Sequence, residues 1–129
     1  MSVPTTAARP VIRSATRKDI AEFSPVSLSR TVTAIVAEVE GRIVAFAGFA
    51  HIGGRIVGFF EFNREALAYP VTIHRTAKRL IREQLQKHKY IYATPDEDEP
   101  RAEAWLASLG FRRLEDVPDN LWRLDRDDS

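Results

Sequence analysis

The stretch Arg55-Ile-Val-Gly-Phe-Phe-Glu-Phe-Asn63 decides the fold. It is rich in β-branched and aromatic residues and is bounded by Gly53-Gly54 and Asn63-Arg64, so it predicts a short buried strand over residues 56–62. From Pro70 onward the apolar residues take helical spacing, and those on the apolar face are Ile73, Ala77, Leu80, Ile81 and Leu85. A strand that leads through a loop to a helix N-terminus offers unpaired N–H groups and a positive dipole end to an anion. An ordinary strand–loop–helix unit without a ligand explains the same pattern, and both interpretations stay open.

The segments on either side of this unit predict a mixed α/β domain. Further strand patterns cover residues 11–16, 33–40, 43–50, 90–94, 111–114 and 121–124. Helix patterns cover residues 17–23 and 70–88, and a third helix follows Pro100, with a buried stripe of Ala102, Trp105, Leu106 and Leu109. Gly41-Arg42 and Gly53-Gly54 separate three consecutive strands at hairpin distances, which favours an antiparallel meander. The order is β-α-βββ-α-β-α-ββ, and it predicts a mostly antiparallel sheet of six to seven strands with helices on both faces.

Local signals predict the helix ends and the domain limits. Thr16 can cap the helix over residues 17–23 through its hydroxyl. The acidic run Asp96-Glu-Asp-Glu99 before Pro100 is typical of a helix start, and Gly110 lies where a left-handed cap would end that helix. We expect a single domain over residues 11–124, with tails at residues 1–10 and 125–129.

Composition excludes several kinds of site. The 129 residues are 44% hydrophobic and 29% charged, as in an ordinary globular domain, and the net charge of +1 argues against a nucleic-acid partner held by bulk electrostatics. The absence of cysteine excludes disulfides and thiolate chemistry, and the three histidines lack companion ligands, so no metal is expected. No apolar run approaches the roughly 18–20 residues that cross a bilayer, and the N-terminus lacks the apolar core of a signal peptide. We therefore expect a cytoplasmic protein without membrane contacts.

The end of the chain carries a family resemblance. The segment Ala102-Glu-Ala-Trp-Leu-Ala-Ser-Leu-Gly-Phe111, together with the element order, resembles the GNAT superfamily of acyl-CoA-dependent N-acyltransferases. The resemblance covers roughly Val11 to Leu124 and implies the GNAT fold. It also implies that the strand over residues 56–62 and the helix from Pro70 hold acetyl-CoA.

The resemblance assigns the donor-binding residues. In the family the backbone of this strand pairs with the pantetheine amides, which implies that role for Phe60 and Phe62. A Gln/Arg-x-x-Gly-x-Gly/Ala turn donates N–H groups to the pyrophosphate, and the aligned residues are Thr72, His74, Arg75, Thr76 and Ala77. Arg75 replaces the first glycine and Thr72 replaces Gln or Arg. The guanidinium of Arg75 can contact phosphate, whereas its Cβ narrows the approach to the backbone, so whether Arg75 binds or blocks the pyrophosphate stays open.

The resemblance also implies a catalytic residue. Glu61 stands about where several family members carry the glutamate that deprotonates the acceptor amine. The other interpretation, in which Glu61 faces solvent from an alternating strand, stays open. The family's tyrosine acid aligns with Leu106, which cannot donate a proton, and Glu99 stands where the family often has asparagine.

Two functions of different classes are consistent with these residues. The first is a small N-acyltransferase that uses acetyl-CoA and an unidentified amine, with Glu61 as base. The second is a non-catalytic GNAT-fold module for binding or assembly, in a homo-oligomer or with a protein partner. The second is favoured by the short segment between Phe23 and Thr33, which has little room for the two helices that shape the acceptor pocket in the family. Compact chains of this kind resemble phage-encoded proteins, some of them virion-associated.

Overall fold

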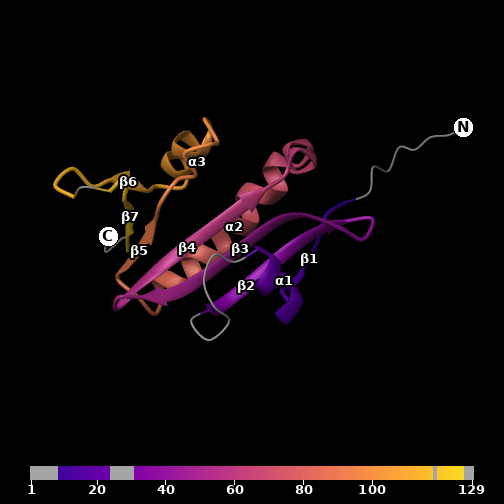
Figure 1. Ribbon diagram of the computed structural model, residues 1–129, viewed down its shortest axis with the longest axis horizontal. Helices are drawn as coiled ribbons and strands as arrows, with labels where there is room; N and C mark the ends of the chain where they lie inside the picture. Colours follow the sequence, from indigo (N-terminus) through magenta and orange to yellow (C-terminus); the bar gives the residue numbers. More distant parts are fainter. Residues whose placement is uncertain (1–8, 24–30, 118, 127–129) are drawn as a thin grey trace, which may run out of the picture.

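The computed structural model describes residues 9–23, 31–117 and 119–126, and this part of the chain forms one sheet with helices packed against it (Figure 1). The strands are β1 Val11–Ser14, β2 Thr31–Val39, β3 Arg42–Ile52, β4 Arg55–Phe62, β5 Tyr90–Ala93, β6 Arg112–Arg113 and β7 Trp122–Asp125. The helices are α1 Arg17–Phe23, the short 3-10 helix η2 Arg64–Ala68, α2 Pro70–Leu85 and α3 Ala102–Ser108. The predicted fold class and element order are confirmed, with η2 as an addition.

The seven described strands lie in the order β1-β2-β3-β4-β5-β7-β6. All neighbours are antiparallel except β4 and β5, because α2 carries the chain from the end of β4 back to the start of β5. The predicted meander is β2-β3-β4. Its second hairpin turns at Gly53 and Gly54, whose φ angles of 57° and 78° are readily adopted only without a Cβ.

Helices cover both faces of the sheet, as predicted. On one face, Ile20 and Phe23 of α1 pack with Val36 and Phe46 of the sheet. On the other face, α2 and α3 share one core with β3, β4, β5 and β7. Its buried members include Phe49, Leu80, Ile81, Ile91, Leu106 and Trp122. Burying a side chain of this size contributes roughly 1.5–3 kcal/mol, so this larger core holds the two helices in register with the central strands.

The structure corrects several predicted boundaries. The third helix starts at Ala102 rather than at Pro100, because the acidic run before it forms turns: the carboxylate of Asp96 accepts from the amide of Asp98 at 2.9 Å, and the amide of Ala102 donates to the Glu99 carbonyl at 3.0 Å. The sixth strand shrinks to the two residues of β6, and α2 ends at Leu85 instead of residue 88. Gly110 has a φ of 103°, which confirms the left-handed helix cap. Most of the predicted tails over residues 1–10 and 125–129 lies outside the described residues, and so do residues 24–30 in the short segment after Phe23.

The start of α1 is tied to the sheet through a buried carboxylate. Asp19 is 6% exposed, its carboxylate accepts from the amide of Thr16 at 2.8 Å, and its own amide donates to the Thr16 hydroxyl at 3.1 Å. This reciprocal pair confirms Thr16 as the cap of α1. Arg13 of β1 donates to the Asp19 carboxylate at 2.7 Å and also pairs with Glu38 of β2. The carboxylate therefore joins α1 to two strands.

Replacing Asp19 by alanine should lower the free energy of unfolding by roughly 2 kcal/mol, because the substitution removes half of the helix cap and an ion-pair partner in one step. Urea unfolding measures the loss. Glu22→Ala is the matched control, since Glu22 is an exposed carboxylate on the same helix and its loss should change stability by less than about 0.5 kcal/mol. Equal losses in the two variants would contradict this role of Asp19.

The same carboxylate makes stability depend on pH in the acid range. The hydrogen bond from Arg13, and then that from the Thr16 amide, holds the pKa of Asp19 below its usual value of 3.8. The unfolded chain therefore takes up this proton at a higher pH than the folded chain does. The stabilisation from this carboxylate is complete when the pH lies above the pKa of Asp19 in the unfolded chain. It is lost as the pH falls from that pKa toward the lower pKa of Asp19 in the folded chain. Asp19→Asn should flatten the decline in stability below about pH 5.

Candidate active site

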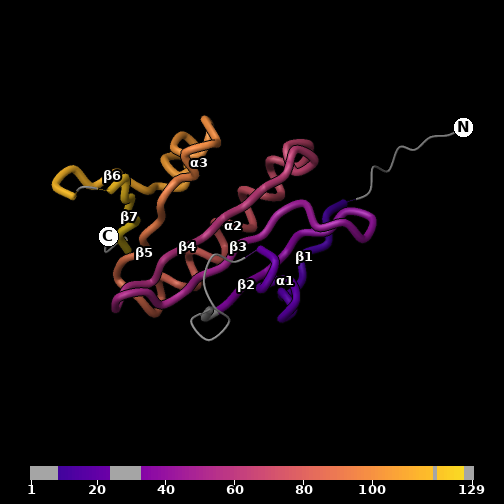
Figure 2. Tube along the Cα trace, in the orientation of Figure 1, coloured from indigo at the N-terminus to yellow at the C-terminus, as the bar shows by residue number. Residues whose placement is uncertain are grey.

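The central sheet opens between β4 and β5. These strands pair over two residues only, Val57 opposite Tyr92 and Gly58 opposite Ala93, whereas β4 stays paired with β3 as far as Phe62. Past Gly58 the two parallel strands diverge, β4 toward η2 and β5 toward α3, and Figure 2 shows the resulting V. The divergence leaves the second half of β4 with a neighbour on one side only.

The backbone of this half-strand points polar groups into the opening. The amide of Asn63 donates to the carbonyl of Val44 in β3 at 3.0 Å, so residue 63 directs its backbone groups toward β3. Backbone direction alternates along a strand, so Glu61 also faces β3, whereas the N–H and C=O groups of Phe60 and Phe62 face the side that β5 has left. Two residues of β4 thus offer strand-type hydrogen bonds to an extended ligand.

A cavity of about 1330 Å³ fills the opening and continues along α2. Its walls come from β4, η2, α2, the segment after β5, and α3. The predicted site residues that line it are Phe60, Glu61, Phe62, His74 and Arg75. Thr72, Thr76 and Ala77 do not line it, and Ala77 is buried in the core between α2 and the sheet. The cavity therefore brings together the strand residues and two of the helix residues.

The segment that was expected to form a pyrophosphate turn is helical. Residues 72–77 lie within α2, so the amides of residues 74–77 donate to carbonyls one turn earlier and cannot cradle a phosphate. Pro70 occupies the first position of the helix, where its fixed φ favours helix and its missing N–H is not needed. Because no glycine follows before the end of α2, nothing interrupts the helix at the place where the family has a turn.

The free helix amides lie earlier, at the first turn of α2. The amide of Ile73 already donates to the Tyr69 carbonyl at 3.0 Å. Pro70 has no N–H, so the amides of Val71 and Thr72 are the ones that precede the helical hydrogen-bond pattern. Any backbone contact to an anion at this helix would therefore come from these two amides.

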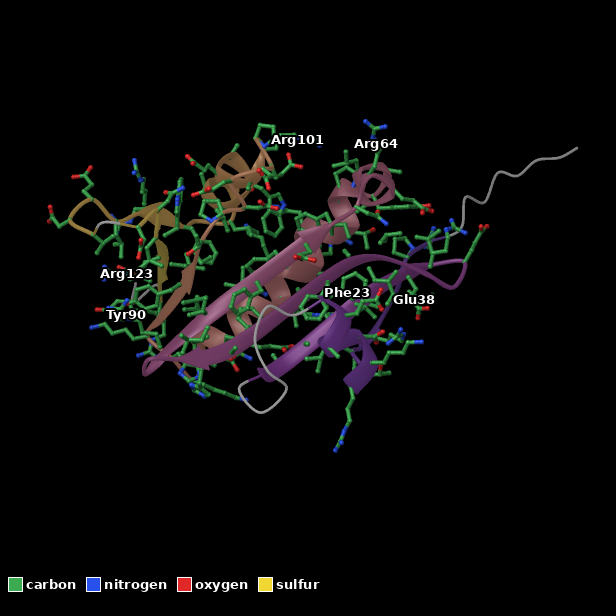
Figure 3. The ribbon with its side chains drawn as sticks, in the orientation of Figure 1. Phe23, Glu38, Arg64, Tyr90, Arg101 and Arg123 are labelled. Carbon is green, nitrogen blue, oxygen red and sulfur yellow. The ribbon has the colours of Figure 1, made fainter. Side chains whose placement is uncertain are left out.

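Cationic side chains form one wall of the cavity. The lining cations of α2 and η2 are Arg64, Arg75, Lys78, Arg79 and Arg82. None of these five forms an ion pair within residues 9–23, 31–117 and 119–126. Arg64 and Arg101, both labelled in Figure 3, line the cavity from η2 and from the turn before α3. The long wall along α2 thus carries uncompensated positive charge.

An aromatic cluster forms the floor where the strands separate. Trp105 of α3 meets Phe60 edge-on at 5.2 Å and Phe62 at 4.7 Å between ring centroids. The apolar spacing placed Trp105 in the buried stripe of its helix, but it is only half-buried and lines the cavity. The cluster offers an apolar surface to a ligand that runs along β4.

Glu61 stands on the other side of the sheet from this floor. It pairs in register with Phe46, which packs under α1, so its side chain points to the α1 face of β4. Glu61 is exposed and lines the cavity. The exposed side chain agrees with the interpretation in which Glu61 faces solvent, and its role as the base stays a prediction.

The described cavity walls contain no tyrosine. Leu106, at the position aligned with the family's acid, is 3% exposed and packs in the core. Glu99 also borders the cavity, but the Arg101 amide, and then the Arg101 side chain, lowers the pKa of its carboxyl. Glu99 is therefore ionised at neutral pH and cannot supply a proton to a leaving group.

The described residues also bear on metal binding and on membrane insertion. They contain no group of three or more His, Cys, Asp or Glu side chains arranged to hold a metal ion. Among them, no helix is long and apolar enough to cross a bilayer.

Comparison with known proteins gives a clear structural match and no sequence match. No protein-family model matches the sequence, and no curated protein does. The ribosomal-protein-S5-alanine acetyltransferase from Vibrio fischeri superposes with a TM-score of 0.67 at 13% identity, over 98% of each chain. A protein from Salmonella typhimurium, solved with its cofactor acetyl-CoA, gives a TM-score of 0.63 at 14% identity, over 94% of this chain and 96% of that one. A GNAT-family acetyltransferase from Bacillus anthracis gives 0.57 at 14% identity, and here the match covers 72% of this chain and 66% of the relative.

The chain has the GNAT fold. The sequence resemblance is thereby confirmed at the level of architecture, and low identity explains why no family model detects it. In this GNAT fold, the parallel pair that diverges is β4 and β5, and the opening lies beside the first turn of α2. The early start of α2 is a backbone deviation from the pattern expected of the family, in addition to the residue replacements at Thr72, Arg75, Glu99 and Leu106.

Proposed function

We propose that this chain is an N-acyltransferase that moves an acyl group, in the simplest case acetyl, from a coenzyme A thioester to an amine. The observation that carries the proposal is the opening between β4 and β5. There, outward-facing backbone groups of β4, an aromatic floor and a cationic wall border one cavity. These three features match the amides, the aliphatic arm and the phosphates of acyl-CoA respectively.

The donor would be held mainly by β4 and α2. The backbones of Phe60 and Phe62 would pair with the pantetheine amides as a missing strand would. Because the amides of residues 74–77 are engaged within α2, the diphosphate would be bound by the side chains of Arg75 and His74 and by the free amide of Val71, which lines the cavity. Thr76 and Ala77 do not line the cavity, so they would not contact the donor.

Glu61 would act as the base, directly or through a water molecule. It would take a proton from the acceptor ammonium, and the neutral amine nitrogen would then attack the thioester carbonyl carbon. The C–N bond forms, the C–S bond breaks, and the thiolate leaves. The proton that the attacking nitrogen loses as the amide forms passes through water to the thiolate, since the described walls hold no tyrosine acid. The carboxylates of Asp96 and Glu99 also border the cavity and favour a cationic acceptor.

Calorimetric titration of acetyl-CoA into the purified protein tests this proposal. We expect a dissociation constant in the micromolar range and release of free thiol when a primary amine is added. Binding without thiol release, over a broad panel of amines, would favour the non-catalytic module. No heat at millimolar acetyl-CoA would refute the acyltransferase and leave the binding or assembly role.

A further inference from the structure

The cavity mouth carries exposed apolar side chains. Of the four large hydrophobic residues that the described chain leaves exposed, three line this cavity: Phe62, Leu67 and Val71, with exposed fractions of 38%, 49% and 65%. Leu67 is on η2 and Val71 is in the first turn of α2, so both lie at the end of the cavity that is farthest along β4. Exposed apolar residues gathered at one site indicate contact with a partner.

Cations line the same cavity as these apolar residues, one on η2 with Leu67 and three farther along α2. Arg64 on η2 and Lys78, Arg79 and Arg82 on α2 line the same cavity, and they form no ion pair within the described ranges. We call the surface made by Arg64, Leu67, Val71, Lys78, Arg79 and Arg82 the docking face. A small apolar centre with an uncompensated cationic rim is complementary to an acidic protein surface with a few apolar side chains.

The helical start of α2 selects among donors. Coenzyme A carries a diphosphate and an adenosine phosphate, and the backbone turn that would cradle the diphosphate is replaced by helix. A 4′-phosphopantetheine arm attached to a protein serine carries a single phosphodiester. One guanidinium, that of Arg75, is sufficient to contact it. The opening along β4 accepts the pantetheine part equally well in both cases.

We propose that the preferred donor is an acyl group on the 4′-phosphopantetheine arm of an acidic acyl carrier protein, with the carrier seated on the docking face. This inference rests on the proposed acyl transfer and names the partner that delivers the thioester. The amine attacks the carrier's thioester carbon, the C–S bond breaks, and the free thiol stays on the carrier. The carrier covers Leu67 and Val71, and its carboxylates pair with the α2 cations.

Binding measurements test the proposal without knowledge of the acceptor. The probes are an acetylated acidic acyl carrier protein, the same carrier without its phosphopantetheine arm, and acetyl-CoA. We expect the acetylated carrier to bind at least about tenfold more tightly than acetyl-CoA and than the armless carrier. Its affinity should fall steeply with ionic strength, because the rim charges are exposed.

Two double variants and two matched controls locate the carrier on this surface. Leu67→Ser with Val71→Ser, and Arg79→Glu with Arg82→Glu, should each weaken carrier binding by about tenfold or more. Val11→Ser is the control for the first, since Val11 is 61% exposed on β1 and lies outside the cavity. Arg17→Glu with Lys18→Glu on α1 is the control for the second, with the same change in charge. Both controls should bind the carrier as the unaltered protein does.

The outcomes separate this inference from the proposed function. If acetyl-CoA binds and the carrier binds no better, the carrier is not the donor, while acyl transfer from coenzyme A stands. If the carrier binds equally well to the docking-face variants and to the controls, the carrier binds elsewhere on the protein and the inference is wrong. If neither donor binds, the acyltransferase itself is wrong.

Discussion

Glu61→Gln should reduce the rate of acyl transfer by about 10²–10⁴-fold, the range that loss of a general base typically causes. The amide keeps the size of the side chain and its place at the edge of the cavity but cannot accept the ammonium proton. Because Glu61 is exposed and forms no ion pair within the described residues, the melting temperature should change by no more than a few degrees. Single-turnover kinetics with acetyl donor in excess measure the effect on the chemical step.

Glu97→Gln provides the matched control for this substitution. Glu97 is an exposed carboxylate that lies near the opening in sequence, next to Asp96, but does not line the cavity. Glu97→Gln makes the same change in charge as Glu61→Gln and should leave the rate of acyl transfer within about twofold of that of the unaltered protein. A Glu61→Gln protein with an unaltered rate would remove Glu61 from the mechanism, and water alone would then have to accept the proton.

Arg75→Glu should weaken the binding of acetyl-CoA by about 30-fold or more. A guanidinium that pairs with phosphate contributes a charge-assisted contact, and the glutamate adds repulsion in its place. The effect depends on Arg75 being exposed on the wall of the cavity and free of ion pairs within the described residues, so that its charge is available to the ligand. Calorimetry measures the affinity of each variant.

Two further variants decide between binding and obstruction at Arg75. Arg75→Lys keeps the charge and loses the planar fork, so a partial loss indicates a bidentate phosphate contact. Arg17→Glu on α1 has the same change in charge on the opposite face of the sheet and should bind acetyl-CoA normally. If Arg75→Glu or Arg75→Ala bound acetyl-CoA more tightly than the unaltered protein, the side chain would block the phosphate site instead of forming it.

The fold could be predicted from the sequence because its signals are local. Gly41 and the pair Gly53-Gly54 set the hairpins, Thr16 caps α1, and helical spacing after Pro70 gives the apolar face of α2. The helix boundary that was predicted wrongly depends on competition between helical hydrogen bonds and local side-chain hydrogen bonds. The side chain of Asp96 closes a turn with the Asp98 amide, and this local bond displaces the start of the third helix.

The site could be predicted only in part, because its shape depends on contacts between distant segments. The family resemblance pointed to Phe60 and Phe62, and both line the opening, but no local pattern shows that β5 leaves β4 after Gly58. Trp105 was read as core because its spacing fits a buried stripe, whereas its ring lies against β4 in the cavity. Leu67 and Val71 did carry a signal, since both are large apolar residues that fall outside the apolar face of α2.

The pyrophosphate turn shows how a motif alignment and local physics can disagree. The alignment at Leu80 and Ile81 places residues 72–77 at the family's turn, but the same residues follow a proline that starts a helix and contain no glycine to end it. The backbone of residues 72–77 follows the helix-start signal at Pro70 and not the aligned motif. Any phosphate contact from that segment must therefore come from its side chains and not from its backbone amides.

A crystal of the protein soaked with acetyl-CoA tests the central claim most directly. We expect the pantetheine arm between β4 and β5, its amides hydrogen-bonded to the backbones of Phe60 and Phe62, and its phosphate beside Arg75. The proposed donor site would be wrong if the protein's own side chains filled the opening and acetyl-CoA, at saturating concentration, were absent or bound elsewhere.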